Sequence, residues 1–257
     1  MTKYNRYQAF YTLVRREYVR MLRISTQVFL PPVITTSLYF LIFGTIIGRR
    51  IGDINGFDYT TFIAPGLIMM SVITSSYGNV ASSFYSVRFQ KNVEEMLVSP
   101  MSYGILMGGF VIGGVLRGFI VGLLVFVVSC FFISYDLHHW VVAVITLLAV
   151  SLMFSLAGFT NAMLARNFDD VMIIPTFVLM PLTYLGGVFF STTMLSAFWQ
   201  KVSLFNPILY MVSAFRYGML GQSSISHITS LAIIFSFILF FWVLNLVMMY
   251  KGVGLRE

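Results

Sequence analysis

Long runs without a single charged residue constrain this chain more than any other feature of its sequence. Residues 24–48 and 59–87 contain no Asp, Glu, Lys or Arg. Each run can cross the hydrocarbon core of a bilayer as a helix, which takes about 20 residues. The chain is 58% hydrophobic and 10% charged, whereas a soluble domain carries about 25% charged residues. Because so few charges cannot cover a water-facing surface, the sequence predicts an all-α integral membrane protein.

The other apolar runs raise the expected number of spans to six. Residues 191–222 are too polar to span and too apolar for a free loop, so we expect short re-entrant helices there, buried in protein on the outer side. The whole of residues 1–257 is then a single transmembrane domain. The four further runs are residues 101–135, 140–165, 171–190 and 228–250.

Residues 4–23 precede the first span and have the pattern of an amphipathic helix. Arg16, Arg20 and Arg23 gather away from its aromatic and aliphatic face. Such a pattern favours an interfacial helix that lies in the headgroup layer of the lipid bilayer and is attracted to anionic lipid. The residues at 3.6-residue spacing are Tyr7, Phe10, Tyr11, Val14, Tyr18, Met21 and Leu22.

The positions of the basic residues predict the orientation, because Lys and Arg gather on the cytoplasmic side of membrane proteins. Both termini are expected inside, and nucleic acid is not an expected partner because topology explains the basic excess. Predicted outer segments hold Arg49, Arg50, Lys201 and Arg216. Predicted inner segments hold Lys3, Arg6, Arg15, Arg16, Arg20, Arg23, Arg88, Lys91, Arg166, Lys251 and Arg256.

Arg117 is the one charge inside the third apolar run, and two interpretations of it stay open. If the span begins near Leu116, the guanidinium lies at the headgroups; otherwise it lines a polar cavity inside the membrane. Glycines four residues apart surround it, a spacing that lets another helix approach closely. The pairs are Gly104/Gly108, Gly109/Gly113, Gly114/Gly118 and Gly118/Gly122.

A short polar stretch, residues 88–100, separates the second and third runs. Asn92 and Glu95 have the spacing of a capping box at a helix start, and Pro100 limits the helix to about two turns. A helix so short is marginal alone, so we interpret it as an element held by a partner outside the membrane. An ordinary solvated loop is the alternative. The apolar residues on one face of this helix are Val93, Met96 and Leu97.

Several function classes lack their motifs in this sequence. There is no G-x-x-x-x-G-K-[ST] loop for nucleotide phosphates, no H-E-x-x-H and no G-x-S-x-G. The nine acidic residues lie outside the long apolar runs, which disfavours a proton-coupled mechanism. The three histidines lie at predicted loops or span edges and suit neither a metal site nor a membrane enzyme. We expect no catalytic residue, metal or cofactor on this chain.

The order of these features resembles the permease subunit of type 2 ABC exporters: a basic surface helix, two spans, a short capped helix, four more spans and an outer re-entrant pair. The resemblance covers nearly the whole chain. The family often has proline where this chain has Ser191 and Ser196. The stretches that carry the resemblance are residues 92–100 and Gly187-Val-Phe-Phe190, running on to Trp199, Asn206-Pro207, Tyr210 and Arg216.

The resemblance implies a function and a set of partners. A separate ATPase subunit in two copies, carrying ATP and Mg, would drive two facing copies of this chain to export amphipathic cargo (a drug, lipid or lipid-linked glycan) across the bacterial cytoplasmic membrane. The outer gate would be Trp199, Asn206, Pro207, Tyr210 and Arg216. The coupling helix for the ATPase would comprise Asn92, Val93, Glu94, Glu95, Met96 and Leu97.

In this picture the apolar side chains of residues 92–97 would fill a groove on the ATPase. Glu94 and Glu95 would pair with basic residues at the rim of that groove. A channel or secondary carrier that works without ATP is the alternative function.

Overall fold

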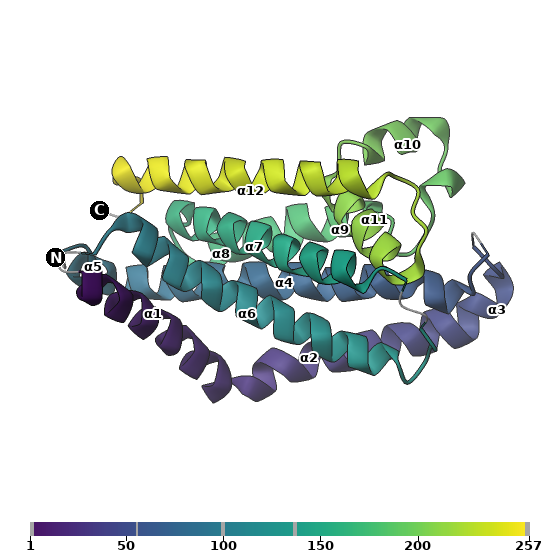
Figure 1. Cartoon of the computed structure of the whole chain (residues 1–257), viewed down its shortest axis with the longest axis horizontal. Coiled ribbons are helices and arrows are strands. Elements are labelled where there is room, and N and C mark those ends of the chain that lie inside the picture. Colours follow the sequence, from purple (N-terminus) through teal and green to yellow (C-terminus); the bar gives the residue numbers. More distant parts are fainter. Residues whose placement is uncertain (1–2, 55, 99–100, 136–137, 255–257) are drawn as a thin grey trace.

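The computed structural model describes residues 3–54, 56–98, 101–135 and 138–254, and these residues form helices and their connections without a β-strand (Figure 1). Six segments of this described part are long and apolar enough to cross a membrane. The prediction of an all-α membrane fold with six candidate spans is thereby confirmed. The six segments are Ser25–Gly44, Tyr59–Phe89, Tyr103–Ser129, Trp140–Leu164, Phe168–Leu185 and His227–Tyr250.

Three helices form the centre of the bundle: α4 (Tyr59–Phe89), α6 (Tyr103–Ser129) and α7 (Trp140–Leu164). Helix α4 has 31 residues and is buried on most of its faces by its neighbours. Its apolar residues are spread around the helix and form no single stripe, as expected for a helix enclosed by others. The other spans pack around this centre and expose more of their apolar surface.

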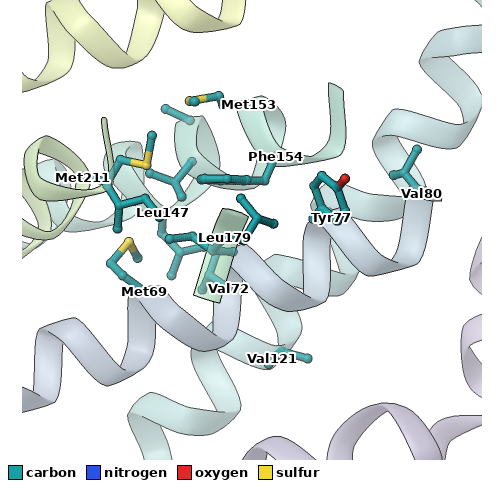
Figure 2. Packing of buried hydrophobic residues seen from close by; sticks show 14 of the residues in the cluster. Met69, Val72, Tyr77, Val80, Val121, Leu147, Met153, Phe154, Leu179 and Met211 are labelled. Atoms are coloured by element: carbon teal, nitrogen blue, oxygen red, sulfur yellow. The ribbon is translucent and has the colours of Figure 1, made fainter. Parts of the chain in front are cut away.

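Aromatic and aliphatic side chains join the three central helices. The ring of Phe84 in α4 lies 4.2 Å from that of Phe159 in α7 and 5.2 Å from that of Phe110 in α6, measured between centroids. Figure 2 shows the apolar packing around Val72 of α4 and Leu147 of α7. These contacts hold α4 in place along its length.

The glycines of α6 permit close packing on two sides, as their spacing predicts. A Cβ atom added to Gly118 would lie 2.8 Å from Ser151 Oγ of α7, and one added to Gly122 would lie 2.7 Å from Val72 of α4. On another face of α6, a Cβ added to Gly109 would lie 2.7 Å from Leu13. Real side chains essentially never come so close, so a larger residue at these positions requires the neighbouring side chains or helices to shift.

Helix α1 (Lys3–Arg23) lies along α6 and meets α2 (Ser25–Tyr39) at a bend (Figure 1). The predicted helix over residues 4–23 is present. Its tyrosines Tyr7 and Tyr11 are exposed, whereas Glu17 is buried against the bundle. The face that packs on α6 therefore carries a charge, a feature that the apolar periodicity of this helix does not indicate.

The first and fifth spans are irregular helices. The first continues from α2 into the π-helical η1 (Phe40–Ile47) and then α3 (Gly48–Ile51). The fifth consists of α8 (Phe168–Ile174), the π-helical η2 (Pro175–Leu179) and α9 (Met180–Leu185). Pro175 has no N–H and removes one bond of the α-helical ladder, which gives a local reason for the change of helix type there.

The segment before the last span folds into three short helices, namely η3 (Thr192–Met194), α10 (Ala197–Ser203) and α11 (Pro207–Leu220). Helix α11 is buried along most of its length and packs against α7 and α12 (His227–Tyr250). Helix α10, by contrast, is mostly exposed, so only part of residues 191–222 is enclosed by this chain.

The two ends of the bundle carry different elements. Figure 1 shows α5 (Asn92–Val98), the start of α1 and the end of α12 at one end, and α3 and α10 at the other. The rings of Tyr103 and Tyr250, at the α5 end, lie 5.1 Å apart. The bundle therefore returns to its starting side, as an even number of crossings requires.

Candidate functional site

Helix α5 is a short helix that packs against α4. Lys91 takes a positive φ of 60°, which makes the sharp turn out of α4. The helix begins at Asn92 and extends to Val98, close to the two turns predicted; Ser99 and Pro100 lie outside the described residues. The predicted capping box does not form, because Asn92 is already helical and its Nδ2 donates to Gln90 Oε1 at 3.1 Å.

The apolar face of α5 points into this chain, and its acidic face points outward. Val93 is 1% exposed and Met96 packs partly against the core of this same chain. Val93 is therefore unavailable to a partner in this arrangement, contrary to the expectation that it fills a groove on another protein. Glu94 and Glu95 are exposed, and Val98 is 88% exposed. The side chain of Leu97 lies outside the part of the chain that the structure describes.

Arg88, in the last turn of α4, ties the base of α5 to the bundle. Its Nη1 donates to Ala162 O at 2.8 Å and to Met163 O at 2.7 Å, and its Nη2 donates to Ala165 O. These are carbonyls at the C-terminus of α7, which lack helical partners and carry partial negative charge. One cation thus caps α7 and fixes the end of α4 to it.

A basic pocket of about 290 Å³ lies beside α5. Tyr85 at its edge donates a hydrogen bond to Arg166 O at 3.1 Å, a second link between α4 and the end of α7. The sequence contains Arg88, Lys91 and Arg166 but does not indicate that they line one pocket. The pocket is lined by Tyr85, Arg88, Phe89, Lys91, Val93, Glu94, Arg166 and Gly254.

A charged cluster joins α1, α4 and α6. Glu17 is 3% exposed, accepts a hydrogen bond from Ser83 Oγ at 2.8 Å and pairs with Arg20 Nη2 at 2.9 Å. Arg20 Nη2 also donates to Asn79 Oδ1 at 2.7 Å, and Arg117 Nη1 donates to the same oxygen at 3.4 Å. Helix α6 begins at Tyr103, so Arg117 lies in the middle of a continuous helix, and its hydrogen bond to Asn79 makes it part of this cluster.

At the opposite end of the bundle, three side chains hold the backbone of α9 and of the residues that follow it. Asn206 Nδ2 donates to Leu182 O at 2.6 Å, Arg216 Nη2 donates to Gly187 O at 2.8 Å, and Tyr59 OH donates to Phe189 O at 2.9 Å. Gly187 has a φ of +73°, a conformation that other residues rarely adopt. Two of the predicted gate residues, Asn206 and Arg216, therefore converge on one segment. Tyr59 was missed because its partner lies 130 residues away in the chain.

Asn206, Pro207 and Tyr210 also make local contacts at the start of α11. Asn206 Oδ1 accepts from Ile208 N at 3.0 Å and caps α11, and Pro207 occupies the first helical position, where its missing N–H costs nothing. Tyr210 OH donates to Leu204 O at 2.8 Å. Trp199 lies on the exposed side of α10 and does not join these contacts.

Arg216 is the most unusual of these residues, since it is a cation with 6% exposure. Its guanidinium carbon lies 4.0 Å from the centre of the Phe62 ring. Its Nε is buried and has no hydrogen-bond partner among the described residues, and no carboxylate there forms an ion pair with it. Within the same part of the chain, no three His, Cys, Asp or Glu side chains gather closely enough to hold a metal ion.

Comparison with known proteins gives consistent results. The model of the family described as ABC-2 type transporter matches residues 8–220. An inner membrane transport permease named YadH, from Escherichia coli strain K12, is 50% identical over 242 residues, which cover 94% of each chain. Nodulation protein J from Rhizobium leguminosarum bv. viciae is 24% identical over 212 residues, 81% of each chain.

Proposed function

Because this chain belongs to the ABC-2 type transporter family, we propose that it is the membrane-spanning subunit of an ATP-driven exporter. Two copies face each other, and a separate ATPase subunit, also present twice, binds ATP and Mg. The related permease is an inner membrane protein, which supports a bacterial cytoplasmic membrane as the location. Both termini are then cytoplasmic, on the side that carries α5.

The observation that carries this proposal is the placement of α5. It lies beyond the apolar spans, presents Glu94 and Glu95 outward, and is joined to α4 by a tight turn. Arg88 fixes the end of α4 to α7. A partner that binds the acidic face of α5 would therefore push on packed helices rather than on a flexible loop. Packed interiors deform little, so the push reaches the far end of the bundle.

The open face of α4 supports a transport path. Ser71 and Thr74 lie partly exposed on it, and their hydroxyls donate to carbonyls of their own helix at 3.0 and 2.9 Å. A groove of about 210 Å³ separates this face from α2. Hydroxyls beside apolar side chains suit amphipathic cargo, and a second copy of the chain would close the path. The groove is lined by Pro31, Pro32, Thr35, Thr36, Tyr39, Leu67, Met70, Ser71 and Thr74.

The first experiment is mild extraction of the tagged chain from native membranes, followed by measurement of the proteins that come with it. We expect an ATPase at about one copy per permease, as a transporter of two permeases and two ATPases requires.

The double substitution Glu94→Lys, Glu95→Lys should abolish ATPase-coupled export while the protein still inserts and folds, because reversed charges repel a basic rim. The neutral pair Glu94→Gln, Glu95→Gln should have a smaller effect.

Asp53→Lys is the matched control, because Asp53 is exposed and follows α3, a helix at the opposite end of the bundle (Figure 1). It should leave ATPase binding and export unchanged. Normal export by the double lysine variant would refute the role of α5. Cargo flux through liposomes that contain the purified chain alone, without ATP, would instead support a channel or secondary carrier.

A further inference from the structure

A pocket of about 200 Å³ opens at the end of the bundle that carries α10. Three of its lining residues are buried, namely Phe62 of α4 and Arg216 and Leu220 of α11, so they form its floor. Exposed polar residues form its mouth: Thr193, Gln222 and Ser224. Arg216 is the only charged residue among those that line it.

The charge of Arg216 is incompletely compensated. Burying a cation is costly unless an anion or several hydrogen-bond acceptors surround it. Here the described residues supply one carbonyl, that of Gly187, and the face of the Phe62 ring. A guanidinium has five N–H donors; here Nη2 donates to Gly187 O, and Nε is enclosed by protein without an acceptor among the described residues. The pocket beside this incompletely compensated charge therefore has room for one more acceptor group.

Two further donors are available at the mouth. The side chains of Gln222 and Ser224 form no hydrogen bond with other described residues. By contrast, the hydroxyl of Ser223 already donates to Ile225 O, and that of Thr193 shares a hydrogen bond with Ser191. A guanidinium at the floor with an amide and a hydroxyl above it is a suitable donor set for an oxyanion, since arginine matches phosphate oxygens in pairs.

The volume of the pocket and its apolar walls indicate which class of ligand it can hold. Pockets for drug-sized molecules measure about 300–1,000 Å³, so this smaller one suits a headgroup rather than a whole drug molecule. Phe57 and Leu220 give it apolar walls next to the polar mouth. We propose that Arg216, Gln222 and Ser224 bind the phosphate group of a ligand, either a lipid headgroup or a free phosphate.

This inference deepens the proposed export function, because it assigns a phosphate-bearing class of ligand to the outer end of the transporter. If Arg216 only anchors the backbone at Gly187, it needs no ligand. The two roles differ in whether the protein binds phosphate through this residue, which can be measured without transport or ATP.

The test uses the full chain purified with its ATPase subunit in a neutral maltoside detergent. Binding is measured by isothermal titration calorimetry with three probes: dihexanoyl phosphatidic acid, dihexanoylglycerol with the same acyl chains but no phosphate, and inorganic phosphate. We expect phosphatidic acid to bind at least about tenfold more tightly than dihexanoylglycerol, as expected for charge-assisted hydrogen bonds. Similar affinities for inorganic phosphate and phosphatidic acid would identify a free anion as the ligand, and much weaker binding of inorganic phosphate would identify a lipid.

Substitutions assign the binding to this pocket. Arg216→Gln should weaken phosphatidic acid binding at least about tenfold, and Arg216→Lys should weaken it less. The double variant Gln222→Leu, Ser224→Val changes only exposed residues and should weaken it about fivefold or more, even if the Arg216 variants fail to fold. Lys201→Gln removes an exposed cation of neighbouring α10 and should leave the affinity unchanged.

Equal binding of phosphatidic acid and dihexanoylglycerol would overturn the inference. So would unchanged phosphatidic acid binding in a folded Arg216→Gln protein, or in the double variant at the mouth. The proposed function fails separately, through retained export in the α5 charge reversal. A transporter that couples normally through α5 but binds no phosphate would refute only the ligand assignment.

Discussion

Glu17 sits where α1, α4 and α6 meet, and its carboxylate is the acidic member of a mostly cationic cluster. It pairs with Arg20 at 2.9 Å and more loosely with Arg16 at 3.6 Å, and Arg117 contributes another positive charge nearby through Asn79. Positive charges held close together repel each other unless an acid offsets them. The burial of Glu17 therefore reflects electrostatic balance as well as packing.

At the residue scale, Glu17→Gln should destabilise the protein. The amide keeps the shape of the side chain but removes the negative charge that accepts from Ser83 and Arg20. Loss of hydrogen bonds to a charged group costs about 2 kcal/mol or more. We expect a lower midpoint of thermal unfolding for the purified protein in detergent.

Arg16→Gln provides the control for this change. The Arg16 side chain is 39% exposed and its contact with Glu17 is long, and exposed pairs contribute about 1 kcal/mol or less. Equal unfolding midpoints for Glu17→Gln and the unaltered chain would show that the cluster does not stabilise the junction of the three helices.

At the scale of elements, the packing of α4 on α7 depends on Gly158. A Cβ atom there would lie 2.5 Å from the backbone oxygen of Tyr77, and backbone cannot rotate away as a side chain can. Gly158→Ala should therefore force the two helices apart and cost about 1–3 kcal/mol, as overpacking does. The measurement is the midpoint of thermal unfolding in detergent.

Gly78→Ala is the matched control in α4, because a Cβ there meets nothing within 4 Å. Alanine is a better helix former than glycine by about 1 kcal/mol, so this variant should be as stable as the unaltered chain or slightly more stable. If both alanine variants unfold alike, the close approach of α4 and α7 does not limit stability.

For helix α5, the sequence predicts the approximate bounds but not the direction of the apolar face. The structure places it at Asn92–Val98, close to the predicted position and length of about two turns, although the predicted capping box does not form. The direction of its apolar face does not follow from local residues. A periodic pattern specifies which side chains share a face, whereas the neighbour that covers this face is decided by how the rest of the chain packs against α5.

At the scale of the whole molecule, the proposed path predicts where water reaches the spans. In a Cys130→Ala background, which removes the exposed native thiol, Thr74→Cys should react with a charged, water-soluble thiol reagent. Leu239→Cys, on the exposed apolar side of α12, should react at least about tenfold more slowly, because only a hydrated thiol ionises to the reactive thiolate.

Measured labelling rates of the full transporter in membranes test this arrangement. Equal labelling of the two cysteines would contradict a hydrated path along α4. Faster labelling of Thr74→Cys in the presence of ATP would further connect the path to the action of the ATPase.

The sequence by itself determines the six spans, the all-α class and the approximate bounds of the short helix, because charge-free length, periodicity and local turn residues are properties of neighbouring residues. Glycine spacing on α6 likewise predicts close packing before the partner helices are known. Only the tertiary structure decides that Val93 faces inward, that Arg117 joins Asn79, and that Arg216 lies over Phe62. Each of these depends on helices distant in the chain, whose pairing is set by packing of the whole bundle.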